Sequence, residues 1–252
     1  NGNIEYKMVN FAYHDEDGSD EGITLKNVNL KINSGEKVGI IGSTGSGKTS
    51  LVQLIPRLYD VMDGELLIDG VNVRDYELSN LRMQIAFVTQ EAIIFEGTFL
   101  SNIKQGKEDA TIEEVTEASR MACALEFISN TDDKFDSVVN QGGVNLSGGQ
   151  RQRLSLARAL VRNPKIIILD DATSAVDAKT EKEIKDNLHE LKDVTLLMVA
   201  QKISSIIDSD KIIVINNHGE IDGFGNHQEL LKSSKVYQEI YYSQFGGEQL
   251  EF

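Results

Sequence analysis

Two segments near the beginning of the chain, residues 4–11 and 24–32, alternate apolar and polar side chains. Alternation with a period of two is typical of half-buried antiparallel strands. Other segments are short and apolar at almost every position, which predicts buried strands. These lie at 38–41, 85–88, 166–169, 196–200 and 211–215.

Helical periodicity dominates the chain from about residue 91 to residue 162. The expected helices lie at 50–58, 112–121, 148–161 and 180–191, and two short helices follow a turn at 217–219. Strand, helix and strand joined by short links imply parallel pairing under right-handed crossovers. With a hairpin at 66–70, the pattern predicts an α/β fold. A parallel sheet and N-terminal antiparallel strands are expected, with an inserted α-helical subdomain.

The charge of the chain changes this picture little but excludes some partners. The net charge of −15, from 40 acidic and 25 basic residues, argues against nucleic acid, which would require a basic face. No apolar run approaches the roughly 18–20 residues that cross a bilayer, and residues 1–10 are too polar for a signal peptide. The acidic segment 14–22 lacks the spacing of a calcium loop and is expected to be a solvated hairpin loop.

The chain contains one cysteine, Cys123, so an intrachain disulfide is excluded and a reducing compartment is indicated. Its apolar, Ala-rich neighbourhood predicts a small buried hydrophobe rather than a nucleophile.

The strand at 38–41 runs directly into a segment that matches the phosphate-binding P-loop pattern GxxxxGK[ST]. Its residues, with the next helical position, are Gly42, Ser43, Thr44, Gly45, Ser46, Gly47, Lys48, Thr49 and Ser50. Glycines allow successive N–H groups to point inward as an anion nest, and the helix N-terminus adds positive potential. Lys48 is expected to reach the β- and γ-phosphates and Thr49 to ligate Mg²⁺. The strand–loop–helix context argues against the alternative, a merely structural glycine-rich turn.

The apolar strand at 166–169 ends in Asp170. An aspartate there places a carboxylate at the carboxyl edge of the sheet, where it is expected to hold Mg²⁺ through a water. Four apolar residues and an aspartate are a weak signal alone, but downstream of a P-loop they predict the acidic partner of the phosphate site.

Further motifs follow in a fixed order. They are Phe11-Ala12-Tyr13, then Gln90 after the strand at 85–88, then Leu146-Ser147-Gly148-Gly149-Gln150, then Ser174-Ala175-Val176-Asp177. Over essentially its full length, the chain resembles the nucleotide-binding domain of an ABC transporter. The resemblance implies a P-loop NTPase core with a RecA-like parallel sheet. Residues 1–89 and 163–252 would form the ATP-binding core with the antiparallel β subdomain, and residues 90–162 the helical subdomain.

The resemblance also gives each motif a role. It implies that Tyr13 stacks on adenine, that Gln90 contacts Mg²⁺ and takes part in catalysis, and that residues 174–177 form the D-loop. The signature at 146–150 would grip the γ-phosphate of an ATP seated on an opposing domain, because its residues open a helix. Two domains would then enclose two ATP molecules head to tail.

Residues 90–98, 102–103 and 225–230 resemble exporter-type rather than importer domains. Such domains follow a six-helix membrane half that this chain lacks, so it is expected to be the ATPase part separated from that half. It would act at the cytoplasmic face of the cell membrane, with exporter transmembrane domains and a second nucleotide-binding domain as partners. The arginines near the signature are expected to form salt links or solvated faces, and His227 to cap or pack a helix. These arginines are Arg151, Arg153, Arg158 and Arg162.

Two positions depart from the active members of the family, and one four-residue stretch departs from many exporters. Asp171 stands where they carry the glutamate that polarises the attacking water, and its side chain is shorter by about 1.5 Å. Gln201 stands where they carry a histidine that contacts the γ-phosphate, and an amide cannot carry the imidazolium charge. Residues 140–143 replace a Gly-Glu-Arg-Gly-like stretch that contacts the coupling helices.

Asp171 and Gln201 together favour the hypothesis of a degenerate half of a heterodimeric bacterial exporter. The chain would hydrolyse ATP slowly at its own site, while its signature completes the site of a different, competent partner. Neutral drift with hydrolysis retained is the alternative. Two other classes stay open: a soluble ABC-type ATPase of translation or DNA maintenance, and an ABC importer ATPase subunit.

Overall fold

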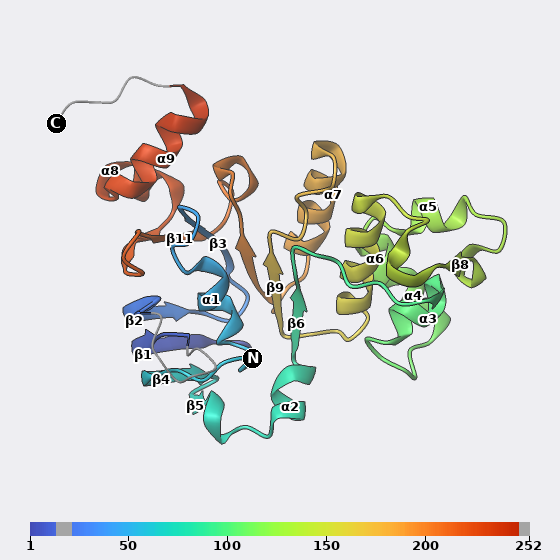
Figure 1. Cartoon of the computed structure of the whole chain (residues 1–252), viewed down its shortest axis with the longest axis horizontal. Helices are drawn as coiled ribbons and strands as arrows, with labels where there is room; N and C mark the ends of the chain where they lie inside the picture. The colour runs from blue at the N-terminus through green and yellow to red at the C-terminus, as the bar shows by residue number, and fades with distance from the viewer. Residues whose placement is uncertain (14–21, 247–252) are drawn as a thin grey trace. The chain divides into compact units, whose positions relative to one another are not determined.

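The computed structural model describes residues 1–13 and 22–246 (Figure 1), so the predicted acidic loop lies outside the described residues except for Gly22. The chain divides into two compact units. The first contains residues 1–82 together with those from 193 onward, and the second contains residues 83–192. The boundaries predicted from the resemblance, with residues 90–162 as an inserted subdomain, stay a prediction.

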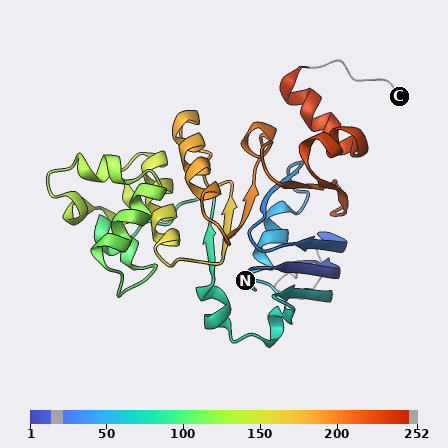
Figure 2. The same cartoon turned by 180° about the vertical axis from the view of Figure 1, so that it is seen from behind.

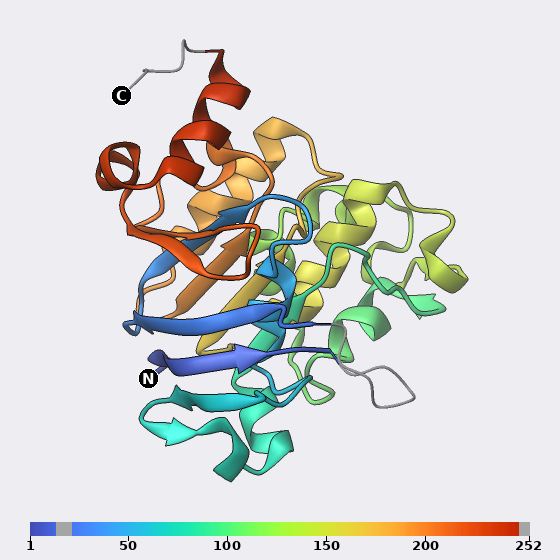
Figure 3. The same ribbon diagram turned by 60° about the vertical axis from the view of Figure 1, so that its left-hand side comes forward.

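The first unit begins with an antiparallel sheet in the order β2–β1–β4–β5, visible in Figure 3. Its strands are β2 (Leu25–Ile32), β1 (Ile4–Phe11), β4 (Asp63–Ile68) and β5 (Val71–Asn72). A bulge near Met8, whose φ is 52°, changes the buried face of β1 from Ile4 and Tyr6 to Val9 and Phe11. The predicted antiparallel strands and hairpin are confirmed.

The first unit also contains strands in the order β12–β11–β3–β10. β3 (Lys37–Gly42) lies between β10 (Thr195–Val199) and β11 (Lys211–Ile215) and is parallel to both, whereas β12 (Ile221–Gly225) is antiparallel to β11. Almost every residue of β3, β10 and β11 is buried. The apolar runs therefore predicted these strands correctly.

Helix α1 (Lys48–Gln53) follows β3, and α8 (His227–Ser233) and α9 (Lys235–Phe245) follow β12. The predicted helix at 50–58 begins earlier and is shorter. It ends at Gln53 because Pro56 has no N–H to donate and Arg57 adopts a left-handed φ of 52°. His227 opens α8 and packs as expected: its Nδ1 lies 2.8 Å from Tyr237 Oη.

The second unit pairs β6 (Ile85–Val88) in parallel with β9 (Ile166–Asp170), and both strands were predicted as buried apolar runs. Its helices are α3 (Phe99–Lys104), α4 (Ile112–Met121), α5 (Leu125–Ser129), α6 (Gly148–Leu160) and α7 (Ala178–His189). Helices α3 and α4 pack against α6 (Figure 2). The helices predicted at 112–121 and from residue 148 are confirmed. α7 begins two residues earlier than predicted because Asp177 caps it, accepting from Thr180 N.

Smaller elements escaped the sequence patterns because each is too short to show a period. They are β7 (Gly97–Thr98) paired with β8 (Val138–Val139), α2 (Leu78–Met83), and the 3₁₀ turns η1 (Val73–Asp75), η2 (Lys134–Asp136), η3 (Gln141–Gly143) and η4 (Ile203–Ser205). Across residues 1–13 and 22–246, no helix has the length and apolar character needed to cross a membrane.

The expectation of a fully buried Cys123 was wrong. The residue is half-buried at the turn after α4, with a left-handed φ of 53°. Partial burial nevertheless raises the pKa of its thiol to about 11, which keeps it protonated at neutral pH. Thiolates, not thiols, are nucleophiles, so the prediction of an unreactive cysteine stands on this geometry.

The arginines near the signature were expected in salt links or on solvated faces, and this was also wrong for two of them. Arg153 donates to Cys123 O at 2.7 Å and lies over the Phe127 ring. Arg158 donates to Asn102 O at 3.1 Å and to a second carbonyl, and lies over a phenylalanine ring. Backbone carbonyls and aromatic faces, rather than carboxylates, therefore hold these guanidinium groups.

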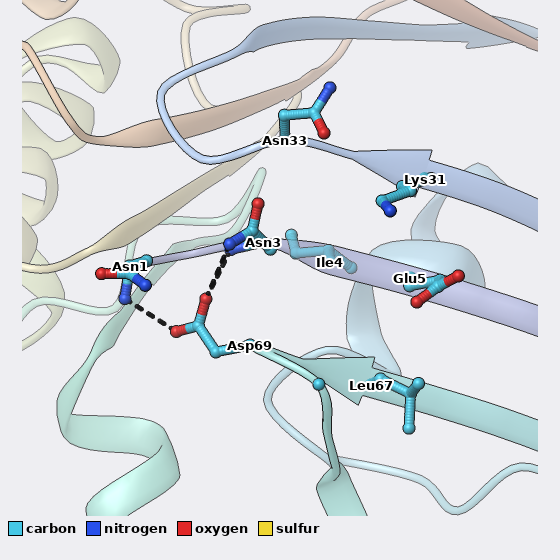
Figure 4. A pocket seen from close by; sticks show the side chains of 9 residues that line it. Asn1, Asn3, Ile4, Glu5, Lys31, Asn33, Leu67 and Asp69 are labelled. Atoms are coloured by element: carbon cyan, nitrogen blue, oxygen red, sulfur yellow. Dashed lines mark hydrogen bonds and ion pairs between the residues drawn. The ribbon is translucent and has the colours of Figure 1, made fainter.

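The antiparallel sheet carries a hollow of about 340 Å³ whose rim includes Asp69, shown in Figure 4. The Asp69 carboxylate accepts from the Asn1 amine at 2.7 Å, from Gly2 N and Asn3 N, each at 3.0 Å, and from Asn3 Nδ2 at 3.1 Å. Burial would raise the pKa of this carboxyl, but the hydrogen bonds outweigh burial and lower it to about 2. Asp69 therefore ties the segment before β1 to the turn between β4 and β5.

We predict that Asp69→Asn lowers the free energy of unfolding by about 2 kcal/mol near neutral pH. The folded-state pKa lies below the ordinary 3.8, so this stability is present above pH 4 and is lost as the pH falls towards 2. Urea unfolding at pH 7 and at pH 2 measures both values. Asp63→Asn, at the exposed start of β4, the strand that precedes this turn, is the control. A loss of equal size at both pH values would contradict the prediction.

Candidate functional site

The segment between β3 and α1 forms a tight loop whose backbone leaves no room for larger side chains at key points. A Cβ on Gly42 would lie 2.4 Å from Ile215 O, so the end of β11 requires glycine there. Gly45 and Gly47 have φ of 79° and 95°, a region that glycine enters without steric cost. These are the backbone conformations that an anion nest needs.

Two side chains show how this loop can receive a phosphate. Ser46 Oγ is buried and has no hydrogen-bond partner among residues 1–13 and 22–246. Lys48 Nζ donates to Gly42 O at 3.0 Å and to Ser43 O at 2.7 Å, so its ammonium lies over the loop itself. A bound anion can therefore accept a hydrogen bond from the Ser46 hydroxyl and pair with the Lys48 ammonium, which already lies at the loop. Thr44, Thr49 and Ser50 complete the predicted set in this segment; Thr49 is exposed.

Tyr13 follows β1 and is tied to α1. Its hydroxyl lies 2.8 Å from Ser50 Oγ and donates to Gln53 Oε1 at 3.2 Å. The ring meets Phe11 edge-on at a centroid distance of 4.8 Å and Tyr59 at 5.0 Å. An aromatic cluster therefore lies beside the helix that leaves the phosphate loop. Sequence analysis missed Tyr59, because a tyrosine in a polar turn carries no signal of its own.

Gln201 belongs to the same unit as the phosphate loop. Val199 of β10 pairs with Ile40 of β3, and Ala200 N donates to Ile40 O at 3.1 Å. Gln201 therefore leaves β10 at the edge of the sheet where β3 ends in Gly42. The structure places this residue at the carboxyl end of the strand neighbouring the P-loop strand, as its predicted role requires.

In the second unit, Gln90 and Asp170 lie at one edge of the β6–β9 pair. Val88 pairs with Leu169, and the two polar residues follow within two positions. Asp170 is buried, and Gln90 is exposed. Both side chains offer oxygen ligands of the kind Mg²⁺ accepts.

Asp171 comes directly after Asp170 and adopts a left-handed φ of 51°. This conformation is sterically unfavourable for L-residues, and aspartate and asparagine adopt it more readily than glutamate does. The backbone at this position therefore suits the residue that the sequence has there.

The signature residues open α6, and Ser147 is its N-cap. Ser147 Oγ accepts from Gln150 N at 3.2 Å, and Gln150 Oε1 accepts from Ser147 N at 2.9 Å, a reciprocal capping box. A Cβ on Gly149 would lie 3.0 Å from Ala175 O, so residues 174–177 approach this helix end closely. Gly148, Gly149 and Leu146 are all half-buried around it.

Gln152 was missed by sequence analysis, although it connects three of the motifs. Its side chain is buried on α6 and donates to Gln90 O and to Ser174 Oγ, both at 3.3 Å. Its Oε1 accepts from Ala175 N at 3.0 Å. One amide thus links the segment after β6, the signature helix and the segment after β9. Only a buried polar residue inside a helical pattern hinted at it.

Comparison with known proteins places this geometry in a family. Residues 25–174 match the family model described as ABC transporter. The chain is 44% identical over 248 residues to an ATP-dependent lipid A-core flippase of Haemophilus influenzae (strain 86-028NP). The aligned region covers 98% of this chain and 41% of the flippase. The chain is also 41% identical over 246 residues to an uncharacterized ABC transporter ATP-binding protein, YwjA, of Bacillus subtilis (strain 168), covering 97% and 42%.

A solved structure of a bacterial Atm1-family ABC exporter with ATP bound matches with a TM-score of 0.90 and 32% identity. It covers 97% of this chain and 42% of that chain, so the α/β architecture expected from the sequence is the one found. The chain spans about two fifths of the length of the relatives it matches. On the family model and on these identities, the chain belongs to the ABC transporter family.

Proposed function

We propose that the chain is the ATP-binding domain of an ABC exporter. It would bind MgATP, pair head to tail with a second nucleotide-binding domain, and drive transmembrane domains from the cytoplasmic face of the membrane. The similarity to a flippase and to an Atm1-family exporter over nearly the whole chain supports the exporter class. The observation that carries ATP binding is the phosphate loop itself, with its left-handed glycines, the unsatisfied Ser46 hydroxyl and the nearby Lys48 ammonium.

Each residue of the proposed nucleotide site has its own role in binding MgATP. The loop at 42–49 donates N–H groups to the β- and γ-phosphates, and Lys48 exchanges its two carbonyl acceptors for phosphate oxygens. Tyr13, oriented by its hydrogen bonds to α1, offers its ring to adenine. Thr49, Gln90 and Asp170 would hold Mg²⁺, which neutralises phosphate charge when bound. The capped end of α6 would receive the γ-phosphate of ATP on the partner domain.

The weaker hydrolysis proposed for this chain's own site rests on Asp171 and Gln201. A carboxylate that is shorter by about 1.5 Å holds the attacking water less well, and misplacement of about 1 Å costs on the order of 10²-fold in rate. The residues of the signature, by contrast, keep an intact capping box. Altered hydrolytic positions beside an intact signature are what a heterodimer with one weak and one competent site requires.

We predict that the double substitution Asp171→Glu, Gln201→His raises ATP hydrolysis at this chain's own site by about 10²-fold. The measurement is single-turnover hydrolysis by the chain mixed with an equimolar exporter domain that carries glutamate and histidine at the two positions. The unsubstituted chain should leave about half of the bound ATP unhydrolysed. Ser147→Ala should instead slow the partner's half. If the unsubstituted chain and its partner hydrolysed both ATP molecules at equal rates, the proposal of one weak and one competent site would be contradicted.

We predict that Gln152→Leu slows hydrolysis at the composite site formed by this chain's signature about tenfold, because the segments holding Gln90 and Ser174 lose their shared hydrogen bonds. Affinity for ATP measured without Mg²⁺ should stay within about twofold, since the phosphate loop belongs to the other unit and Gln90 is proposed to act there through Mg²⁺. Ser155→Ala, half-buried on the same helix, is the matched control. An unchanged rate, with the variant folded by circular dichroism, would show that Gln152 does not position the motifs.

A further inference from the structure

The last helix of the described chain holds the segment that carries Gln201. Gln244 on α9 donates from Nε2 to Gln201 O at 2.7 Å, and its Oε1 accepts from Ile203 N at 2.8 Å. The partners are 43 and 41 positions away in sequence, so the contact is purely tertiary. Two atoms of one planar amide thus hold both ends of the turn from residue 201 to residue 203.

The chemistry of this contact is specific to an amide. The turn after β10 offers one backbone acceptor and, two residues later, one backbone donor. Asparagine and glutamine carry a donor and an acceptor on one planar group whatever the pH, whereas histidine does so only as the neutral imidazole, and glutamine reaches further than asparagine. A glutamate at position 244 could accept from Ile203 N but could not donate to Gln201 O. The pairing therefore depends on the identity of residue 244 and not merely on its size.

The helix that carries Gln244 is well anchored. Tyr237 is fully buried, and its hydroxyl lies 2.8 Å from His227 Nδ1. Ser234 caps the helix by accepting from Tyr237 N at 3.0 Å, and its own hydroxyl donates to Asp222 Oδ2 at 2.5 Å. Helix α9 also contacts β3, β11 and η4. Gln244 therefore reaches the turn from a fixed base.

We propose that Gln244 is a positioning residue for Gln201. By fixing the backbone at residues 201 and 203, helix α9 sets the direction in which the Gln201 side chain leaves β10, and so its reach towards a γ-phosphate. The inference rests on the proposed function, in which Gln201 contacts that phosphate. It gives helix α9 an indirect role at the nucleotide site, through the backbone of residues 201 and 203.

The contact itself is tested by hydrogen exchange on the 252-residue chain without nucleotide. Gln244→Ala should speed exchange of the Ile203 amide about three- to tenfold, the effect of losing one ordinary hydrogen bond. Gln238→Ala removes a glutamine of the same helix that donates to Leu231 O at 2.8 Å, and it should leave the Ile203 amide unchanged. Gln244→Glu should keep most of the Ile203 protection. Unchanged exchange in Gln244→Ala overturns the proposal.

The consequence for the site is tested with two ligands, MgADP and a non-hydrolysable MgATP analogue. Gln244→Ala should weaken binding of the ATP analogue about three- to tenfold and leave the affinity for ADP within about twofold. The reason is that Gln201 is proposed to contact only the γ-phosphate, which ADP lacks. Gln201→Ala should produce the same loss, and the double variant should lose no more than either single one. Gln238→Ala should leave both affinities unchanged.

The two tests separate the inference from the function on which it rests. Should Gln201→Ala leave the ratio of analogue to ADP affinity unchanged, the proposed γ-phosphate role of Gln201 is wrong, whatever the exchange data show. Should Gln201→Ala lower that ratio while Gln244→Ala does not, the role of Gln201 stands and the positioning role of Gln244 is overturned. Additive losses in the double variant would likewise overturn it, since independent effects add.

Discussion

The phosphate loop depends on the close approach of two parallel strands. Gly42 ends β3 opposite Ile215 of β11, and the carbonyl of Ile215 occupies the space that any Cβ on Gly42 would need. The register that creates this approach also brings the ends of β10 and β11 to the same edge. Ser43 Oγ consequently contacts Asn217 in the turn after β11, and Ala200 N bonds Ile40 O just before Gln201. Strand pairing, rather than any single motif residue, therefore assembles this part of the site.

Two side-chain amides, Gln152 (buried) and Gln244 (exposed), carry out the corresponding task away from the sheet. Gln152 ties the signature helix to Gln90 O and to Ala175 N, and Gln244 ties the last helix to the turn after β10. Each amide supplies a donor and an acceptor to backbone groups that no regular ladder satisfies. Unpaired backbone groups are costly when buried, so these residues fix the motif segments at little further cost. In both units the exposed motif residues are held by partners that lie outside the motifs.

Much of the fold followed from the sequence because it rests on local periodicity. The alternation at residues 4–11 and the apolar run at 166–169 both became strands within a residue of their predicted ends. The residues of the phosphate loop were found because their spacing encodes a backbone shape. Gln152, Gln244 and Tyr59 were not found, because a polar or aromatic side chain gains its role only from a tertiary partner. The same reason applies to Arg158, which was expected in a salt link or on a solvated face, whereas its acceptors are the carbonyls of segments distant in sequence.

The substitution at position 171 is better understood from its backbone than from its side chain alone. A φ of 51° is unfavourable for glutamate and less so for aspartate, whose short carboxylate can bond locally. A glutamate in this backbone conformation would therefore be strained, and strain of this kind accumulates where function requires it. Aspartate lowers that strain while keeping a carboxyl group beside Asp170, and under the proposed function a site released from fast hydrolysis would have no need of the strain. Under the proposed function, the shorter reach of Asp171 and its better fit to this backbone would go together, so that a site could keep ATP binding while its catalytic base is weakened.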